Sequence, residues 1–450
     1  MAKLDPAQAA ESLGGDAPLY KKVSWVLYDW ANSGYGLIVI GPVFAPYFIN
    51  VLLPELDAGS GQHGLTVGGI TMPGSAVMAL LTSVSMALMA VAAPVLGAIA
   101  DIKGWTKRLL TIFGVSGAVF TMGMALLSPG QWLLAAVLYV LSNVCFGTSF
   151  TFYNAFLPKL APAEKQGSLS GWGFAAGYVG GAVALIGVLL MVKHDPSLVP
   201  LGLALSGVWW LVFSLPAYLF LDEFPPMARD GDGGPLVMAG FRRVATTFRH
   251  IRQYRMLFIF LLAFLLYNDG VETVISMSPS YATDWLRIEQ KELIGIFLIV
   301  QFVAFGGALL FGYLADWLGN KPVIVINLLL WVAVSLVAMV LTPDVRMELF
   351  GWELTAEGVF LLLGIGIGIV LGGVQASSRA LMALLAPPAI HNEAFGFFSI
   401  SGKFASIFGP LAYAGFATAF GPRWGVLAVP PFLIAGLIVL LRVKEPGRGE

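Results

Sequence analysis

The chain has 450 residues, of which 58% are hydrophobic and only 11% are charged, whereas a soluble globular protein carries roughly 25% charged residues. Because the mean hydropathy is +0.83, most of the surface must face lipid, and the net charge of −1 gives no indication of a nucleic-acid partner. The single cysteine, Cys145, excludes an internal disulfide and is expected to be a packed, inert thiol because it lies in an apolar run.

The N-terminal residues 1–22 are polar or small and lack the apolar core of a cleavable signal peptide. The first hydrophobic stretch is therefore expected to be retained as a membrane helix. Twelve apolar stretches are long enough to cross a hydrocarbon core of roughly 30 Å. They lie near 23–50, 76–100, 109–128, 131–157, 170–192, 200–221, 256–281, 292–315, 322–342, 357–385, 394–419 and 424–442.

Lys and Arg are unevenly distributed among the connections between these stretches. With the N-terminus inside, 18 of the 25 Lys and Arg residues fall in the tails and the even-numbered connections, and five fall in the odd-numbered ones. Positively charged loops are retained on the cytoplasmic side of a membrane. The bias therefore predicts that both termini are cytoplasmic.

The longest gap between predicted helices, residues 222–255, separates an N-terminal bundle (1–221) from a C-terminal bundle (256–450). It begins with the helix-breaking stretch DEFPPMARDGDGGP (222–235). Apolar residues then recur at helical spacing among arginines: Phe241, Val244, Phe248 and Ile251, with Arg242, Arg243, Arg249 and Arg252. The pattern predicts an amphipathic helix lying on the anionic inner leaflet, and the alternative is a solvated basic connector.

The two halves of the chain repeat short motifs at equivalent helices. GAIADIKG (97–104) follows the second predicted helix and GYLADWLG (312–319) follows the eighth. YNAFLPKLAP (153–162) ends the fourth helix and SRALMALLAP (378–387) ends the tenth. The repeats predict an all-α integral membrane protein of twelve transmembrane helices, built as two pseudo-symmetric six-helix bundles with a binding site between them near mid-bilayer.

At this point the sequence resembles a known family. The GxxxDxxG pattern in both repeats is similar to the loop signature of the major facilitator superfamily. More specific motifs resemble its vacuole-effluxer-like branch, which includes fungal vacuolar amino-acid exporters and bacterial permeases: YDWANSGY (28–35), YNAFLP (153–158), GGVQASSR (372–379) and SGKFASIFGP (401–410). The resemblance implies the twelve-helix major facilitator fold, alternating access, transport of small solutes such as amino acids, and a bacterial inner-membrane location.

The signature loops depart from the superfamily pattern at one position each. Ile102 follows Asp101, and Trp317 follows Asp316, where a basic residue is usual. Basic residues occur later in each loop instead, at Lys107 and Arg108 in the first copy and at Lys321 in the second. The pattern is compatible with the tight turn of the loop, but it does not decide whether the loop relays charge.

Five charged residues fall inside predicted helices, where burial of a charge costs from about 3 kcal/mol upward. They are Asp29, Asp269, Glu272, Arg379 and Lys403. Asp29 has two open interpretations, a cavity-facing proton or substrate site and a structural partner for Arg379 or Lys403. Asp269 and Glu272 share a helical face, which favours proton coupling, with neutralisation by Arg379 and Lys403 as the alternative.

Further side chains are expected to line the site or the gate. Arg379 is suited to bidentate binding of a carboxylate, and Lys403 is expected to face the seam between the halves, as a ligand or as half of an ion pair. Candidate neighbours in the site are Tyr28, Asn32, Tyr153, Asn154 and Gln375, of which Tyr153 and Asn154 could equally make ordinary interhelical hydrogen bonds. The candidate gate residues are Gly97, Asp101, Gly312 and Asp316: either Asp could cap a facing helix in one conformation or simply cap a local one.

No enzyme motif accompanies these residues, and without a GxxxxGK[ST] phosphate loop the sequence does not predict an ATP-driven pump. The first hypothesis is a monomeric secondary carrier, without cofactor or metal, whose partners are a small solute, membrane lipids and, for coupling, H+. The second is a translocator of lipids or lipid-linked precursors on the same fold. The third, a membrane receptor or scaffold, leaves the intramembrane charges unexplained.

Overall fold

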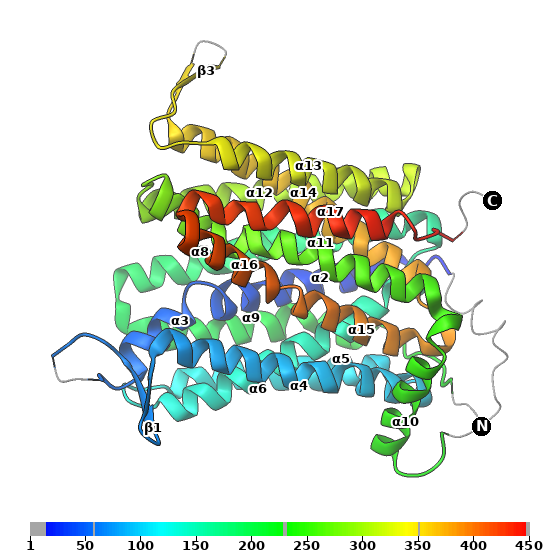
Figure 1. The fold of residues 1–450 in the computed structure, drawn as a ribbon. Helices are drawn as coiled ribbons and strands as arrows, with labels where there is room; N and C mark the ends of the chain where they lie inside the picture. The colour runs from blue at the N-terminus through cyan, green and yellow to red at the C-terminus, as the bar shows by residue number, and fades with distance from the viewer. Residues whose placement is uncertain (1–14, 57–58, 228–231, 350–351, 447–450) are drawn as a thin grey trace.

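The computed structural model describes residues 15–56, 59–227, 232–349 and 352–446, which are almost entirely helical (Figure 1). The N-terminal half contains α2 (Leu19–Tyr35), α3 (Phe44–Tyr47), α4 (Gly74–Lys103), α5 (Thr106–Met122), α6 (Trp132–Ala155), α7 (Leu157–Leu160), α8 (Gln166–His194) and α9 (Val199–Phe220). The linker contains α10 (Leu236–Arg249). The C-terminal half contains α11 (Arg255–Ser280), α12 (Gln290–Leu318), α13 (Asn320–Val340), α14 (Ala356–Leu385), α15 (His391–Phe404), α16 (Phe408–Phe420) and α17 (Val429–Leu440).

The long helices lie side by side, so the protein has two ends (Figure 1). One end carries two antiparallel hairpins, β1 (Gly64–Val67) with β2 (Ile70–Pro73) and β3 (Met347–Leu349) with β4 (Trp352–Leu354). We call it the hairpin side. The other end carries α10, the start of α2 and the end of α17, and we call it the linker side. Its assignment to the cytoplasm remains the prediction of the Lys and Arg bias.

Eleven helical spans within the described residues are long and apolar enough to cross a membrane, and they coincide with eleven of the twelve predicted ones. The prediction of one continuous helix near 394–419 was wrong, because α15 and α16 are separated by a break at 405–407. Pro410 explains the break, since a proline inside a helix lacks an N–H donor and its ring clashes with the carbonyl four residues earlier. With α16 restarting at Phe408, Pro410 falls in a first turn, where it is tolerated.

Both signature loops end their helices at a glycine with a positive φ. α4 stops at Gly104, whose φ of 70° lies in the left-handed region, and α12 stops at Gly319, with a φ of 104°. Glycine adopts such angles without a steric penalty, so the chain turns sharply into the next helix. The turn places Asp101 and Asp316 in the last turns of α4 and α12, where both face the opposite half of the protein.

The linker helix forms as predicted, but the buried face differs from the predicted one. Phe241 and Phe248 are about half exposed, whereas Ala239, Gly240 and Arg243 are buried. Gly240 lies against α4, where a Cβ atom would come within 3.0 Å of the carbonyl oxygen of Val95. The small residues on this face allow the two helices to approach closely, which draws Arg243 into the protein interface instead of leaving it with the lipid headgroups.

Candidate functional site

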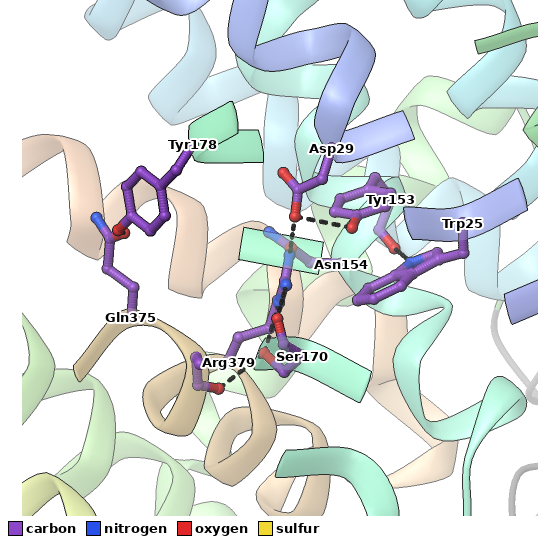
Figure 2. A network of polar contacts seen from close by, with 9 residues as sticks. Trp25, Asp29, Tyr153, Asn154, Ser170, Tyr178, Gln375 and Arg379 are labelled. Atoms are coloured by element: carbon purple, nitrogen blue, oxygen red, sulfur yellow. Dashed lines mark hydrogen bonds and ion pairs between the residues drawn. The ribbon is translucent and has the colours of Figure 1, made fainter. Parts of the chain in front are cut away.

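An ion pair between Asp29 and Arg379 (Figure 2) joins the two halves, closer to the linker side than to the hairpin side. A terminal nitrogen of Arg379, Nη1 on α14, donates to Oδ2 of Asp29 on α2 at 3.0 Å, and both side chains are buried. The same carboxylate oxygen accepts a hydrogen bond from the hydroxyl of Tyr153 on α6 at 2.9 Å. The predicted contact between Asp29 and Arg379 is therefore present, and each charge has its partner in the opposite half.

Most of the guanidinium donors of Arg379 are already engaged in this conformation. Nε and Nη2 donate to the side chain and the backbone carbonyl of Ser170 on α8, at 2.9 and 2.7 Å. Nη1 also reaches Oδ1 of Asn154 at 3.3 Å. The guanidinium carbon lies 4.7 Å from the Trp25 ring and 4.1 Å from the Phe174 ring. A guanidinium has five N–H groups, so the bidentate grip on a substrate carboxylate expected from the sequence is not open to Arg379 in this state.

Room for the ion pair comes from a glycine on α8. A Cβ atom on Gly173 would lie 2.6 Å from Nη2 of Arg379 and 2.9 Å from Oδ2 of Asp29. Neither the guanidinium nor the carboxylate could keep its position beside a larger residue. Gly173 and Ser170 were not among the predicted site residues, although glycines at 173, 177 and 181 follow the four-residue spacing of close helix contacts.

Two adjoining cavities lie beside the ion pair, with volumes of about 190 and 270 Å³. Together they fall within the roughly 300–1,000 Å³ that is typical of small-molecule sites. Both are lined by residues of the two halves, and they share Leu37, Tyr178, Gln301 and Gln375. The smaller one is also lined by Asp29, Asn32, Phe146, Phe150 and Phe174, and the larger one extends to Phe297 and Phe360 on the hairpin side.

Of the other predicted neighbours, Gln375 accepts a hydrogen bond from the hydroxyl of Tyr178 at 2.5 Å, which joins α14 to α8 across the cavity (Figure 2). Tyr28 is fully buried and stacks on Tyr153 with ring centroids 5.0 Å apart. It therefore packs against a residue that binds Asp29 and does not itself line either cavity. Aromatic residues of the cavity wall, and Tyr178 and Gln301, were missed because aromatic and amide residues inside apolar helices carry no distinctive sequence pattern.

The carboxylates of α11 have different surroundings from Asp29. Asp269 is buried, and its Oδ1 accepts a hydrogen bond from the backbone N–H of Gly409 at 2.9 Å, which caps the N-terminus of α16. The break in the eleventh span therefore provides a partner that the sequence did not suggest. Negative charge is favourable at this position because the helix dipole places positive charge at its N-terminus.

Arg379 does not neutralise Asp269 and Glu272, the alternative considered from the sequence. It lies six residues from the linker-side end of α14, whereas Asp269 lies fourteen residues from the linker-side end of α11. At 1.5 Å per residue the two Cα atoms differ in depth by about 12 Å. Arg379 therefore meets Asp29, and the cation that interacts with Glu272 is Lys403.

Lys403 faces the seam between the halves, as expected from the sequence. Its ammonium nitrogen lies over the ring of Phe146, a cavity-lining residue of the opposite half, at 5.7 Å from the centroid. Glu272 interacts with it electrostatically, although among the described residues the two do not approach within the 4.0 Å of a salt bridge. A cation–π contact and a distant carboxylate leave the donors of Lys403 available for a ligand.

Both signature aspartates hold a helix of the opposite half. Asp101 accepts hydrogen bonds from the backbone N–H groups of Asn392 and Glu393, at 3.0 and 3.1 Å, and so caps α15. Asp316 accepts one from the backbone N–H of Ser168 at 3.0 Å and caps α8. The sequence left open whether each Asp caps a facing helix or a local one. In this structure both cap a helix of the facing half.

Gly97 and Gly312, the glycines predicted to belong to a gate, lie at the same contacts. A Cβ atom on Gly97 would be 2.5 Å from the carbonyl oxygen of Asn392, and one on Gly312 would be 2.9 Å from that of Gly167. Each glycine lets two backbones from different halves touch near the capped helix ends. The close approach brings the aspartates within hydrogen-bond distance of their partner helices.

The conformation is closed on the linker side. In the described part of the chain, the hydrogen bonds between the halves extend from the linker-side helix ends to the level of Tyr178 and Gln375, where the cavities begin. These hydrogen bonds between the halves join His391 with Ala155, Trp172 with Tyr313, Ser170 with Ala376, and Thr151 with Ser399. To open this side, the protein must break these bonds together with both aspartate caps.

Comparison with known proteins agrees with this architecture. Residues 20–446 match the family model described as "Vacuole effluxer Atg22 like". The chain is 31% identical to the uncharacterized MFS-type transporter YxiO of Bacillus subtilis (strain 168), over 94% of each chain. It is 26% identical to autophagy-related protein 22-1 of Penicillium rubens, over 88% of this chain and 80% of that one.

Solved structures share the fold at low sequence identity. The proton:xylose symporter XylE superposes with a TM-score of 0.68 at 13% identity, over 98% of this chain and 97% of that one. The human organic anion transporter MFSD10 gives a TM-score of 0.65 at 14% identity, over 97% of this chain and 100% of that one. With the family match over nearly the whole length, this multi-pass membrane protein belongs to the vacuole effluxer Atg22-like family of major facilitator superfamily transporters.

Proposed function

We propose that the protein is a secondary carrier for a small zwitterionic or anionic solute of the amino-acid class, moved by alternating access and coupled to protons. The observation that carries the proposal is the pair of cavities between the halves, with Asp29 in the wall and Lys403 over Phe146 at the edge. A carboxylate in the wall of the smaller cavity and an ammonium group behind one of its aromatic wall residues supply the two charges that complement a zwitterion.

Other features of the cavity support a solute of this size and polarity. Asn32, Gln301 and Gln375 supply amide groups that both donate and accept hydrogen bonds, and aromatic rings supply apolar area. Arg379 then serves as a conformational lock with Asp29, and Lys403 is the cation offered to the solute. In the linker-open state Arg379 and Asp29 separate, which provides a second arrangement of charges for release.

The lipid translocator remains a second candidate because of a different cavity. A volume of about 500 Å³ is lined almost entirely by apolar residues of α4, α10, α11 and α15. Lipid chains bind such surfaces on any membrane protein, so this cavity favours transport of a lipid only if the central site rejects water-soluble solutes.

The test is a thermal-shift screen of the purified protein against amino acids, small peptides, sugars and lysophospholipids. We expect stabilisation by at least one amino acid, and its loss in Lys403→Met, because the substitution removes the ammonium group while keeping the length of the side chain. Lys193→Met, which alters a cation outside the site, is the control. Stabilisation by lysophospholipid alone would favour the second candidate, and an unchanged response in Lys403→Met would contradict the assigned role of Lys403.

Replacement of Asp101 tests the gate. Asp101→Ala removes the acceptor for the N–H groups of Asn392 and Glu393, while the cavity residues stay in place. We expect ligand affinity within about threefold of wild type and a turnover lower by about tenfold, because loss of a charged hydrogen-bond acceptor costs about 1.5–3 kcal/mol in one conformational state only. Counterflow in proteoliposomes measures turnover, and an unchanged rate argues against a latch.

A further inference from the structure

The linker helix carries a buried arginine beside the linker-side gate. Arg243 is 3% exposed, on a helix whose other arginines point away from the protein core. Nη1 donates to the backbone carbonyl of Met227 and to the carboxylate of Asp232, both at 3.1 Å, and Nη2 donates to the backbone carbonyl of Ala389. Burial of a cation is costly unless it is paired, so these contacts define a specific position for Arg243.

The contacts of α10 tie it to the N-terminal half. Gly240 packs on α4, where a Cβ atom would lie 3.0 Å from the carbonyl oxygen of Val95 and 3.1 Å from Ile99. Met227, whose carbonyl accepts from Arg243, donates its own N–H to the carbonyl of Asp101 at 2.7 Å. Arg243 is thus connected to the last turn of α4 through Met227, and its helix is held against α4 at Gly240.

Ala389, in contrast, belongs to the C-terminal half and lies two residues before the start of α15. The following residues are the ones held by the N-terminal half: His391 contacts the carbonyl of Ala155 at 2.7 Å, and Asn392 and Glu393 bind Asp101. Arg243 therefore grips a backbone carbonyl of the same segment whose N–H groups Asp101 grips. The guanidinium also interacts electrostatically with the Asp101 carboxylate.

Apolar contacts extend the linker helix over the seam. The ring of Phe248 lies 5.1 Å from that of Phe397 on α15 and 6.0 Å from that of Phe258 on α11. The small-residue face of α10 is thus packed on α4, whereas Phe248 at its aromatic edge rests on the C-terminal half. Movement of the halves apart on the linker side must break either set of contacts.

We propose that Arg243 is a positioning residue of the gate: from the linker it supplies the cation that the loop itself lacks beside Asp101, and with it α10 braces the linker-closed state. The neighbour of Asp101 in the chain is the apolar Ile102. The basic residues later in the loop make their contacts elsewhere, Lys107 with the carbonyl of Leu219 and Arg108 with the Trp105 ring, and Arg243 is the cation that interacts with Asp101. The proposal rests on the alternating-access carrier proposed above. It makes the linker part of the gate as well as the connection between the halves.

Distance measurements between spin labels test the brace without any substrate. On a Cys145→Ala background, labels at the exposed positions 108 and 442 report separation of the halves on the linker side, and labels at 128 and 344 report the hairpin side. We expect Arg243→Gln to raise the ratio of linker-open to linker-closed molecules by about tenfold, the factor expected for loss of a charged hydrogen bond. The distances on the hairpin side shorten in the same molecules.

Arg249→Gln is the matched control, because it removes the same charge from an exposed position on the same helix and is expected to leave both distributions unchanged. Gly240→Leu tests the brace without replacing Arg243: the added side chain pushes α10, and Arg243 with it, away from α4, and it should shift the ratio in the same direction. If Arg243→Gln does not fold, Gly240→Leu alone tests whether α10 stabilises the linker-closed state.

The outcomes separate this proposal from the proposed function. A shift in Asp101→Ala with none in Arg243→Gln or Gly240→Leu overturns the brace and leaves the carrier intact. An equal shift in Arg249→Gln also overturns it, because the effect then follows surface charge. If no variant, Asp101→Ala included, populates a linker-open state, alternating access itself fails.

Discussion

Asp29→Asn is expected to abolish transport and to destabilise the protein more than any other single replacement in the site. The substitution leaves the guanidinium of Arg379 buried between the halves without a counter-ion. Removal of one partner from a buried ion pair costs about 3–5 kcal/mol, which corresponds to a factor of more than about 100 in an equilibrium. Because the pair joins α2 to α14, the same free energy is lost from the linker-closed state.

The reverse replacement, Arg379→Gln, is expected to be milder. A carboxyl group left alone can bind a proton and lose its charge, whereas a guanidinium stays charged. Tyr153 also remains as a hydrogen-bond donor to Asp29. The double variant Asp29→Asn/Arg379→Gln should recover most of the thermal stability, since no unpaired charge is left, while transport remains lost.

Thermal unfolding of the purified variants, followed by size-exclusion chromatography after heating, measures this order of stabilities. Asp222→Asn is the control, because it removes a partner from the exposed pair with Lys21, and such pairs contribute only about 0–1 kcal/mol. A double variant as unstable as Asp29→Asn alone would mean that the hydrogen bonds of Arg379, and not its charge, hold the halves together.

Replacement of the α11 carboxylates is expected to separate coupling from exchange. Glu272→Gln should abolish accumulation driven by a pH gradient, because the residue can no longer bind and release a proton, and should preserve exchange of solute across the membrane, which moves no net charge. Glu272 is the better candidate for this behaviour because Asp269 has a second role at the N-terminus of α16.

Asp269→Asn should also abolish gradient-driven accumulation, with exchange reduced in addition. Asn keeps an oxygen acceptor for the N–H of Gly409, while Asp269→Ala removes the cap, which costs about 0.5–2 kcal/mol. Exchange should therefore fall from wild type to Asp269→Asn to Asp269→Ala.

The measurement compares counterflow with gradient-driven uptake in proteoliposomes, using the amino acid found in the ligand screen. If Asp269→Asn and Glu272→Gln both keep full gradient-driven uptake, the two residues are structural and Asp29 becomes the next candidate for coupling. A wild-type carrier that ignores the proton gradient would remove the coupling proposal and leave the transporter fold unaffected.

The helices and the division into two halves could be predicted from the sequence because hydropathy is a local property. A run of about twenty apolar residues crosses a bilayer whatever its neighbours are. The buried charges were recognised for the same reason, since an ionisable residue in such a run is conspicuous. The aspartates of the two signature loops followed from the internal repeat, which aligns Asp101 with Asp316.

Only the tertiary structure decided which of these groups meet. Three carboxylates and two cations allow several pairings, and the choice depends on the depth and rotation of each helix. The sequence of a helix that is apolar on all sides does not indicate which face turns toward a given neighbour. The depths of Asp29 and Arg379 bring them together, whereas Asp269 meets the end of a helix that exists because Pro410 breaks the eleventh span. Arg243, which resembled any lipid-facing arginine of an amphipathic helix, is drawn inward because Gly240 lets α10 approach α4, a contact between segments more than 140 residues apart.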